Sequence, residues 1–204
     1  VMEQNHEKIW ERCDGILIPG GFGERGVAGK IETIRFAREN KVPYFGICLG
    51  LQVAVIEYSR NVLGLSEANT AEIDPHARDN VIDMMADQKK VTDMGATMRL
   101  GAYTAELAEG TKIAAIYGQT AISERHRHRY EVNNRYLPQL LEKGLVISGK
   151  NLDLDLVETI ELKDHPWFIG VQYHPEFKSK PMKPHPLFYG FVEAAYQNRL
   201  RQKR

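Results

Sequence analysis

The sequence predicts an α/β fold in three layers, with a mostly parallel central sheet flanked by helices in a single domain, 1–204. Two observations predict it. Apolar stretches of strand type at 15–18 and 44–47 alternate with helical patterns at 30–40 and 51–58, as in the right-handed βαβ units of a parallel sheet. The 204 residues also suffice for one sizeable core, and no repeat, low-complexity tract or linker divides them.

The remaining elements follow from the same kind of pattern. The first stretch, 3–12, predicts a helix that covers the sheet, and the chain begins inside this pattern, so we expect a fragment of a longer protein. The segment 68–73 fits a short strand or a loop. Another short element is expected at 80–85. Further strands are expected at 97–103, 112–117, 125–132, 145–148, 156–162 and 167–173. A helical turn is expected at 119–124, and helices at 135–143 and 187–201.

The composition argues against several classes of function. Lys and Arg together number 27, as do Asp and Glu, and this zero net charge argues against a dedicated nucleic-acid binder, which is typically basic. No apolar run approaches 18 residues and no signal-peptide pattern opens the chain, so we expect no membrane span. Cys13 and Cys48 are too few for a disulfide framework; we interpret them as reduced thiols of a cytoplasmic protein.

The turn between the strand at 44–47 and the helix at 51–58 carries the first chemical signal. Gly46-Ile-Cys48-Leu-Gly50 is the cysteine form of the G-x-S-x-G elbow, a sharp strand-to-helix turn that presents a nucleophile at the tip of a sheet. At a helix N-terminus the helix dipole lowers a cysteine pKa and favours the thiolate. Taken alone, the motif also fits a buried cysteine between ordinary packing glycines.

A thiolate nucleophile needs a base, and the base needs an orienting group. His174 and Glu176 are two residues apart near a strand end, where such residues point the same way, and Pro175 between them stiffens the backbone. The sequence therefore predicts a catalytic triad of Cys48, His174 and Glu176.

Acyl chemistry also needs an oxyanion hole of two N–H donors. Leu49, which follows the nucleophile, supplies one of them. The other is expected from Gly20-Gly21 at the end of the neighbouring strand, because glycine lets the backbone approach a substrate closely.

Two further motifs have less weight. Gly21-Phe-Gly-Glu-Arg-Gly26 fits the G-x-G-x-x-G dinucleotide pattern, but the acidic residue expected about 20 positions later is absent. Arg125-His-Arg-His-Arg129 fits a basic patch or a metal site, but no cysteine lies at ligand spacing and the chain is neutral, so we expect no metal. His126 and His128 are interpreted as structural; surface or turn positions are expected for His76, His165 and His185.

Together and in this order, the motifs resemble the class I glutamine amidotransferases, whose fold is flavodoxin-like. The resemblance rests on three stretches, Pro19–Gly23, Gly46–Gln52 and His174-Pro-Glu176. Further stretches are similar to the glutaminase domains of the CTP synthase family: Ala68–Glu72, Thr97–Ala102, Glu124–Asn134 and His185–Phe188. The match covers nearly the whole chain from Gly15 to Ala195, and it implies an N-terminally truncated sheet that lacks the first strand or two.

The resemblance implies hydrolysis of glutamine to glutamate and ammonia through a thioester. By position, Cys48 is the nucleophile, His174 the proton shuttle and Glu176 its orienting carboxylate, with an oxyanion hole at Gly21 and Leu49. The positions that match the family's glutamine contacts are Gly20, Phe22, Gln52, Glu72 and Arg129. Phe22 and Arg99 are candidate contacts for GTP, the family's allosteric activator.

In the complete family enzyme the ammonia aminates UTP to CTP, a step of pyrimidine biosynthesis. This step uses ATP and Mg²⁺ in a synthetase domain, through which the enzyme forms a homotetramer; none of that domain lies in this sequence. The glutaminase domain itself needs no cofactor, and its partners are L-glutamine and the synthetase domain. Two alternatives stay open: a catalytically silent amidotransferase scaffold, and a free-standing cysteine hydrolase of the same fold.

Overall fold

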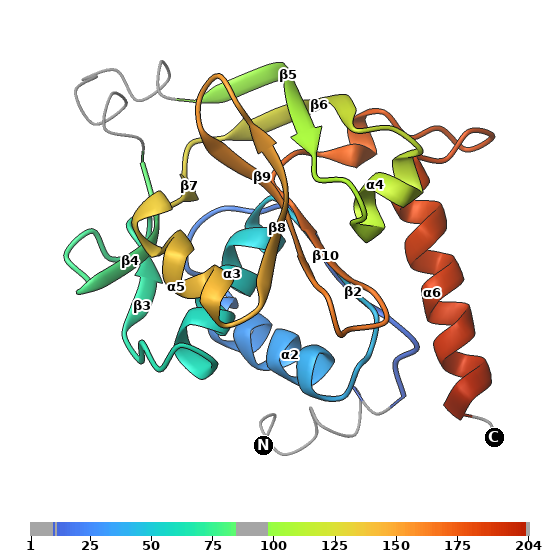
Figure 1. The fold of residues 1–204 in the computed structure, drawn as a ribbon. Coiled ribbons are helices and arrows are strands. Elements are labelled where there is room, and N and C mark those ends of the chain that lie inside the picture. Colours follow the sequence, from blue (N-terminus) through green and yellow to red (C-terminus); the bar gives the residue numbers. More distant parts are fainter. Residues whose placement is uncertain (1–9, 11, 85–97, 203–204) are drawn as a thin grey trace.

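The computed structural model describes residues 10, 12–84 and 98–202, which form two sheets and the helices around them (Figure 1). The seven-stranded sheet has the order β1-β2-β10-β9-β8-β5-β6, and the three-stranded sheet has the order β3-β4-β7. The strands are β1 (Ile16–Ile18), β2 (Tyr44–Ile47), β3 (Ala68–Thr70), β4 (Asp79–Asp83), β5 (Arg99–Leu107), β6 (Ala121–His128), β7 (Glu131–Val132), β8 (Leu145–Asn151), β9 (Leu156–Leu162) and β10 (Phe168–Val171). The helices are α2 (Val27–Glu39), α3 (Leu49–Asn61), α4 (Lys112–Tyr117), α5 (Leu137–Glu142) and α6 (Pro186–Gln202), with the 3-10 turns η4 (Asn134–Tyr136) and η5 (Pro175–Phe177).

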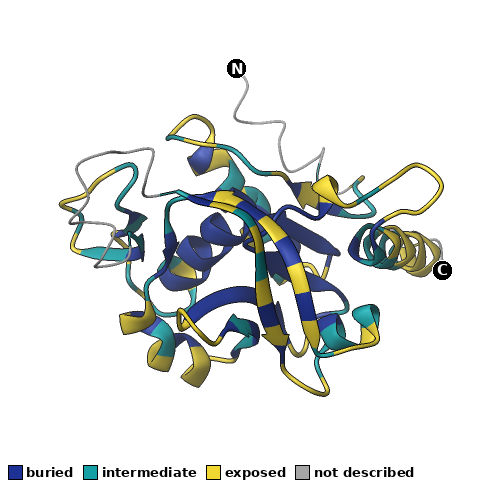
Figure 2. Cartoon of the chain, turned by 90° about the horizontal axis from the view of Figure 1, so that it is seen from above, coloured by how far each residue is buried: buried dark blue, intermediate teal, exposed yellow. Residues whose placement is uncertain are grey.

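The expected three layers are present, because each face of the large sheet has its own apolar core. Side chains alternate along β2, so that Tyr44 belongs to a core with α2 and α3, while Phe45 belongs to a second core with α4 and α6. Figure 1 shows α2 and α3 on one side of β2 and β10, and α6 on the other. Figure 2 shows the buried residues gathered between these layers.

The α/β class is confirmed, but the sheet is mixed rather than mostly parallel. Within the seven-stranded sheet, only the pairings of β2 with β1 and with β10 are parallel; the pairings from β10 through β9, β8 and β5 to β6 are all antiparallel. The connection between β8 and β9, residues 152–155, is a short hairpin loop, which permits only antiparallel pairing. The βαβ pattern of the first sixty residues therefore does not extend to the later strands that the structure describes.

Two local expectations were wrong. Residues 112–117, expected as a strand, form α4, whose first turn is capped by the Thr111 hydroxyl and whose first amide donates to the Glu161 carboxylate at 3.0 Å. Residues 119–124, expected as a helical turn, instead lie largely in β6, where exposed and buried residues alternate strictly. Most of the helix expected at 3–12 lies outside the described residues.

None of the helices in the described ranges combines the length and the apolar character that a membrane span requires.

Candidate active site

The turn from β2 into α3 holds Cys48 in a strained backbone conformation. Its φ is 51° and its ψ is −101°, outside the regions that non-glycine residues ordinarily occupy. Two backbone contacts keep it there: the Cys48 N–H donates to the Val171 carbonyl of β10 at 2.7 Å, and the Cys48 carbonyl accepts from the Gln52 N–H at 3.2 Å. The expected nucleophile elbow is thus formed, at the point where β2 meets its parallel neighbour β10.

The two glycines of the elbow are required by close packing. A Cβ at Gly50 would lie 2.3 Å from the Ile18 carbonyl oxygen of β1, and one at Gly46 would lie 2.7 Å from the Tyr44 hydroxyl. The Tyr44 hydroxyl in turn donates to the Gly50 carbonyl at 2.8 Å. The two glycines are therefore packing residues and elbow residues at once, because close packing at Gly46 and Gly50 is what fixes the turn that presents Cys48.

The expectation of a lowered Cys48 pKa is not met in this structure. Burial raises the pKa of the Cys48 thiol to about 12, against an opposing hydrogen bond from the Leu49 N–H, and nearby carboxylates add to the rise. The residue is 2% exposed, so the loss of hydration outweighs the effect of the helix terminus on the thiol pKa. At neutral pH the thiol is protonated, and a base must take its proton when the sulfur attacks.

His174 lies where such a base is needed. Its Nδ1 is 2.6 Å from the Glu176 Oε1, and its ring stacks on Phe177 at a centroid distance of 5.0 Å. Burial raises the pKa of the Glu176 carboxyl, but hydrogen bonds from His174 and from its own amide outweigh this and leave the pKa below its usual value. The carboxylate therefore fixes the proton of His174 on Nδ1. The other ring nitrogen, Nε2, is buried and has no hydrogen-bond partner among the described residues.

Gly20 shows how near the base lies to the nucleophile. A Cβ built on Gly20 would lie 2.8 Å from His174 Cε1 and 3.7 Å from Cys48 Cβ, so this glycine fits between them. A Cβ on Gly21 would lie 3.1 Å from the Leu49 side chain, so the two residues expected to supply the oxyanion donors are neighbours. The elements β1, β2, β10 and η5 thus meet around Cys48.

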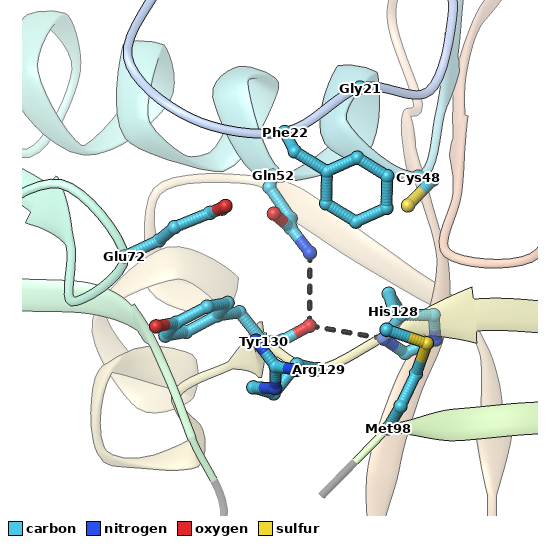
Figure 3. A pocket seen from close by; sticks show the side chains of 9 residues that line it. All are labelled: Gly21, Phe22, Cys48, Gln52, Glu72, Met98, His128, Arg129 and Tyr130. Carbon is cyan, nitrogen blue, oxygen red and sulfur yellow. Dashed lines mark hydrogen bonds between the residues drawn. The ribbon is translucent and has the colours of Figure 1, made fainter. Parts of the chain in front are cut away.

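A pocket opens beside Cys48 (Figure 3). Its empty space, with the solvent at its open mouth counted in, is about 320 Å³. Six of its nine lining residues were expected at the site: Gly21, Phe22, Cys48, Gln52, Glu72 and Arg129. Three were not: Met98, His128 and Tyr130.

The pocket has an acidic end opposite Cys48. The Gln52 Nε2 donates to the Tyr130 carbonyl at 2.9 Å and to the Gln172 Oε1 at 3.3 Å, and this turns the Gln52 amide oxygen toward the Glu72 carboxylate (Figure 3). The Glu72 Oε1 also accepts from the Gly23 N–H at 3.0 Å, which holds the glycine-rich loop over the pocket. The Gln52 amide oxygen and the Glu72 carboxylate are both hydrogen-bond acceptors. Because they face each other across the pocket, they suit an ammonium group, which has only hydrogens to donate.

A buried charge cluster lies behind the pocket. Arg99 is 4% exposed and contacts the Glu131 carboxylate at 3.1 Å and the Glu158 carboxylate at 2.6 Å. His126 Nε2 lies 2.6 Å from the second Glu158 oxygen, so the structural role expected of His126 is confirmed. Arg99, a candidate contact for GTP, is thus buried and paired with the Glu131 and Glu158 carboxylates. Phe22, the other candidate, is 61% exposed at the pocket mouth.

Two histidines expected at surface or turn positions are buried. His165 Nε2 contacts the Ala37 carbonyl at 3.0 Å, and burial lowers the pKa of His165 to about 4. His185 Nε2 contacts Glu124 Oε1 at 3.1 Å, and the same oxygen accepts from Lys178 at 3.1 Å. Glu124 therefore ties the segment after the triad to β6.

Comparison with known proteins connects this geometry to a family. The pattern of the family "Glutamine amidotransferase class-I" matches residues 1–194. The CTP synthase of Clostridium perfringens (strain SM101 / Type A) is 57% identical over 98% of this chain, and that of Listeria monocytogenes serotype 4b is 53% identical over 98%. The chain spans about 37% of the length of these curated relatives.

Solved structures agree with the family match. The Trypanosoma brucei CTPS glutaminase domain with bound acivicin matches with a TM-score of 0.88 and 43% identity, over 93% of this chain and 74% of that chain. A protein from Thermoplasma acidophilum described as a "putative gmp synthase subunit a protein" matches with a TM-score of 0.61 and 15% identity, over 97% of this chain and 80% of that chain. The second match shows a shared fold alone.

Proposed function

The chain belongs to the class I glutamine amidotransferase family, and from this premise we propose that it hydrolyses L-glutamine to glutamate and ammonia at Cys48. The observation that carries the proposal is the strained elbow of Cys48, set against His174 and opening into a pocket with an acidic far end. A free-standing cysteine hydrolase of the same fold is disfavoured, because the chain is 57% identical to CTP synthases over nearly its whole length.

In the proposed reaction His174 Nε2 takes the thiol proton as Cys48 Sγ attacks the carboxamide carbon. The oxyanion of the tetrahedral intermediate accepts hydrogen bonds from the Leu49 and Gly21 amides. When the intermediate collapses, the C–N bond breaks and His174 returns the proton to nitrogen, which gives ammonia and a thioester. Water then attacks the thioester, with His174 again as base, and glutamate and the thiol are released. Glu176 holds the His174 ring in the required tautomer throughout.

The far end of the pocket would bind the amino-acid part of glutamine. We assign the ammonium to Glu72 and the Gln52 amide oxygen, and the carboxylate to Arg129, with Gly20 and Phe22 close by. Arginine suits a carboxylate because its guanidinium bonds both oxygens in one plane.

For the longer protein, we propose that the ammonia aminates UTP to CTP in a synthetase domain. We assign ATP and Mg²⁺ to that domain, and we propose a cytoplasmic homotetramer with GTP as activator. The support is the identity of 57% to CTP synthases, of which this chain spans 37%. Phe22, exposed at the pocket mouth, remains the candidate contact for GTP.

The test is glutamate release by the purified chain, together with mass mapping of the thiol that a glutamine-analogue electrophile labels. We expect Cys48→Ser to abolish both release and labelling with little effect on folding, since Ser is close in size. Cys13→Ser is the matched control and should change neither. We expect Arg129→Ala to weaken glutamine binding far more than it lowers the melting temperature. Glutamate release by Cys48→Ser would refute the assignment. Label on Cys48 without turnover would favour the catalytically silent scaffold.

A further inference from the structure

His128 lies in the pocket at the same side as Cys48. Figure 3 shows Cys48, His128 and Met98 at one side of the pocket and Glu72 at the other. His128 ends β6, where the strict alternation turns its side chain inward, and its residue is 2% exposed.

The surroundings of His128 define which ring nitrogen carries the proton. Nδ1 faces the Tyr130 carbonyl at 3.2 Å and Glu131 Oε1 at 3.4 Å, and both are acceptors, the latter because Arg99 donates to it. Nδ1 therefore carries hydrogen. Burial, together with the charges of His126 and Arg99, lowers the pKa of His128 well below its usual value, so the ring is neutral. Nε2 is then a bare acceptor.

This acceptor is buried without a partner. Nε2 has no hydrogen-bond partner among the described residues, and it belongs to a side chain that lines the pocket. Buried acceptors in proteins are nearly always paired, so an unpaired one in a binding pocket calls for a donor on the ligand. Glutamine has two donor groups, the ammonium, which Glu72 would hold at the far end, and the carboxamide NH₂ at the Cys48 end.

On the basis of the proposed function, we infer that His128 Nε2 accepts a hydrogen bond from the carboxamide NH₂ of bound glutamine. The bond positions the amide for attack and is kept as the nitrogen leaves as ammonia, which also has hydrogens to donate. The Tyr130 carbonyl links this bond to the elbow helix, because the same oxygen accepts from both Gln52 Nε2 and His128 Nδ1 (Figure 3).

The bond makes His128 a specificity residue. Glutamate, the product, has a carboxylate in place of the carboxamide, and a carboxylate has no hydrogen to donate at neutral pH. Its oxygen would face the lone pair of Nε2, and this repulsion favours glutamine over glutamate and speeds product release. A site that must distinguish an amide from an acid of the same shape needs such an acceptor.

The first test is binding without turnover, in the Cys48→Ser chain. Calorimetry gives the affinities for glutamine and glutamate, and their ratio is the readout. Asn at position 128 keeps a donor near the place of Nδ1 but has no atom at Nε2, so we expect His128→Asn to lower the ratio about tenfold. Gln reaches the place of Nε2 with an amide oxygen, so we expect His128→Gln to restore part of the ratio. His128→Leu, apolar and similar in volume, replaces the Asn variant if that variant does not fold.

The second test separates this role from a structural one. A glutamine-analogue chloroketone has no carboxamide NH₂, so its rate of labelling of Cys48 should change less than about twofold in His128→Asn, while kcat/KM for glutamine falls about tenfold. An unchanged affinity ratio, or an equal fall in both rates, would overturn the inference. If the parent chain neither binds glutamine nor is labelled at Cys48, the proposed function itself fails. If the parent does both and His128→Asn matches it, only this inference fails.

Discussion

Gly20→Ala tests how closely the nucleophile and its base are packed. The new methyl group would lie 2.8 Å from His174 Cε1, whereas non-bonded carbons rest about 3.5–4.0 Å apart, so the ring has to move by about 0.7 Å or more. The ring has little freedom to do so. Its Nδ1 is tied to Glu176 at 2.6 Å, one face stacks on Phe177, and the His174 N–H donates to the Arg125 carbonyl at 2.8 Å.

The expected effect is larger on catalysis than on folding. Misplacing a catalytic group by about 1 Å lowers rates on the order of a hundredfold, so we expect kcat for glutamate release to fall about that far. Overpacking of this kind typically destabilises a protein by about 1–3 kcal/mol.

The assay is glutamate release, with the melting temperature measured in parallel. Gly29→Ala is the matched control: nothing lies within 4 Å of its new Cβ, it is inside α2, and it should raise stability by up to about 1 kcal/mol with activity unchanged. Wild-type kcat in folded Gly20→Ala would show that His174 is not held against Cys48 as we describe.

Two other predictions follow from buried titratable groups. Burial raises the pKa of Glu131 to about 8 despite the charge of Arg99, above the ordinary value of 4.5. The folded protein then keeps a proton that the unfolded chain releases, so the stability from this group is full below about pH 4.5 and declines as the pH rises through about 8. Glu131→Gln cannot titrate and should gain stability relative to the parent between pH 5.5 and 8.5 in urea unfolding; parallel curves would contradict this. Cys48 is buried with a raised pKa, whereas Cys13 is partly exposed. Iodoacetamide at pH 8 should therefore modify Cys13 first, and peptide mass mapping measures the order. Faster modification of Cys48 would mean that its thiolate is already present in the folded protein.

The elements that surround Cys48 were predictable because their signals are local. The apolar strand 44–47, the glycines at 46 and 50 and the helix that follows occupy one short stretch, and the structure forms β2, the elbow and α3 there. Six of the nine pocket residues could likewise be assigned by motif position.

The errors arose where distant partners decide the outcome. Residues 112–117 fit a strand pattern, but the Glu161 carboxylate of β9 accepts from the Lys112 and Ile113 amides and so caps a helix. The Gly110-Thr111 and Gly118 positions at its two ends were the available local signal. The lowered pKa expected of Cys48 considered the helix terminus alone and left out burial, which only the packed structure supplies.

His128 was missed for a related reason. Its place in Arg125–Arg129 suggested a strand with an arginine face, and the alternation that turns residues 126 and 128 inward was visible in the sequence. The sequence did not show that His128, the last inward-facing residue of β6, reaches the pocket rather than the core.

Glu72 serves two neighbours with one carboxylate. It accepts from the Gly23 amide of the glycine-rich loop, and it is the group to which we assign the ammonium of glutamine. A ligand that engages Glu72 therefore acts on the loop that carries Gly21, and by linkage the effect is reciprocal. A glutamine side chain within a polypeptide has no free ammonium at this place. Binding of the amino group at Glu72 would thus adjust the position of the oxyanion donor at Gly21. The domain would therefore distinguish free glutamine from protein-bound glutamine in the rate of reaction as well as in affinity.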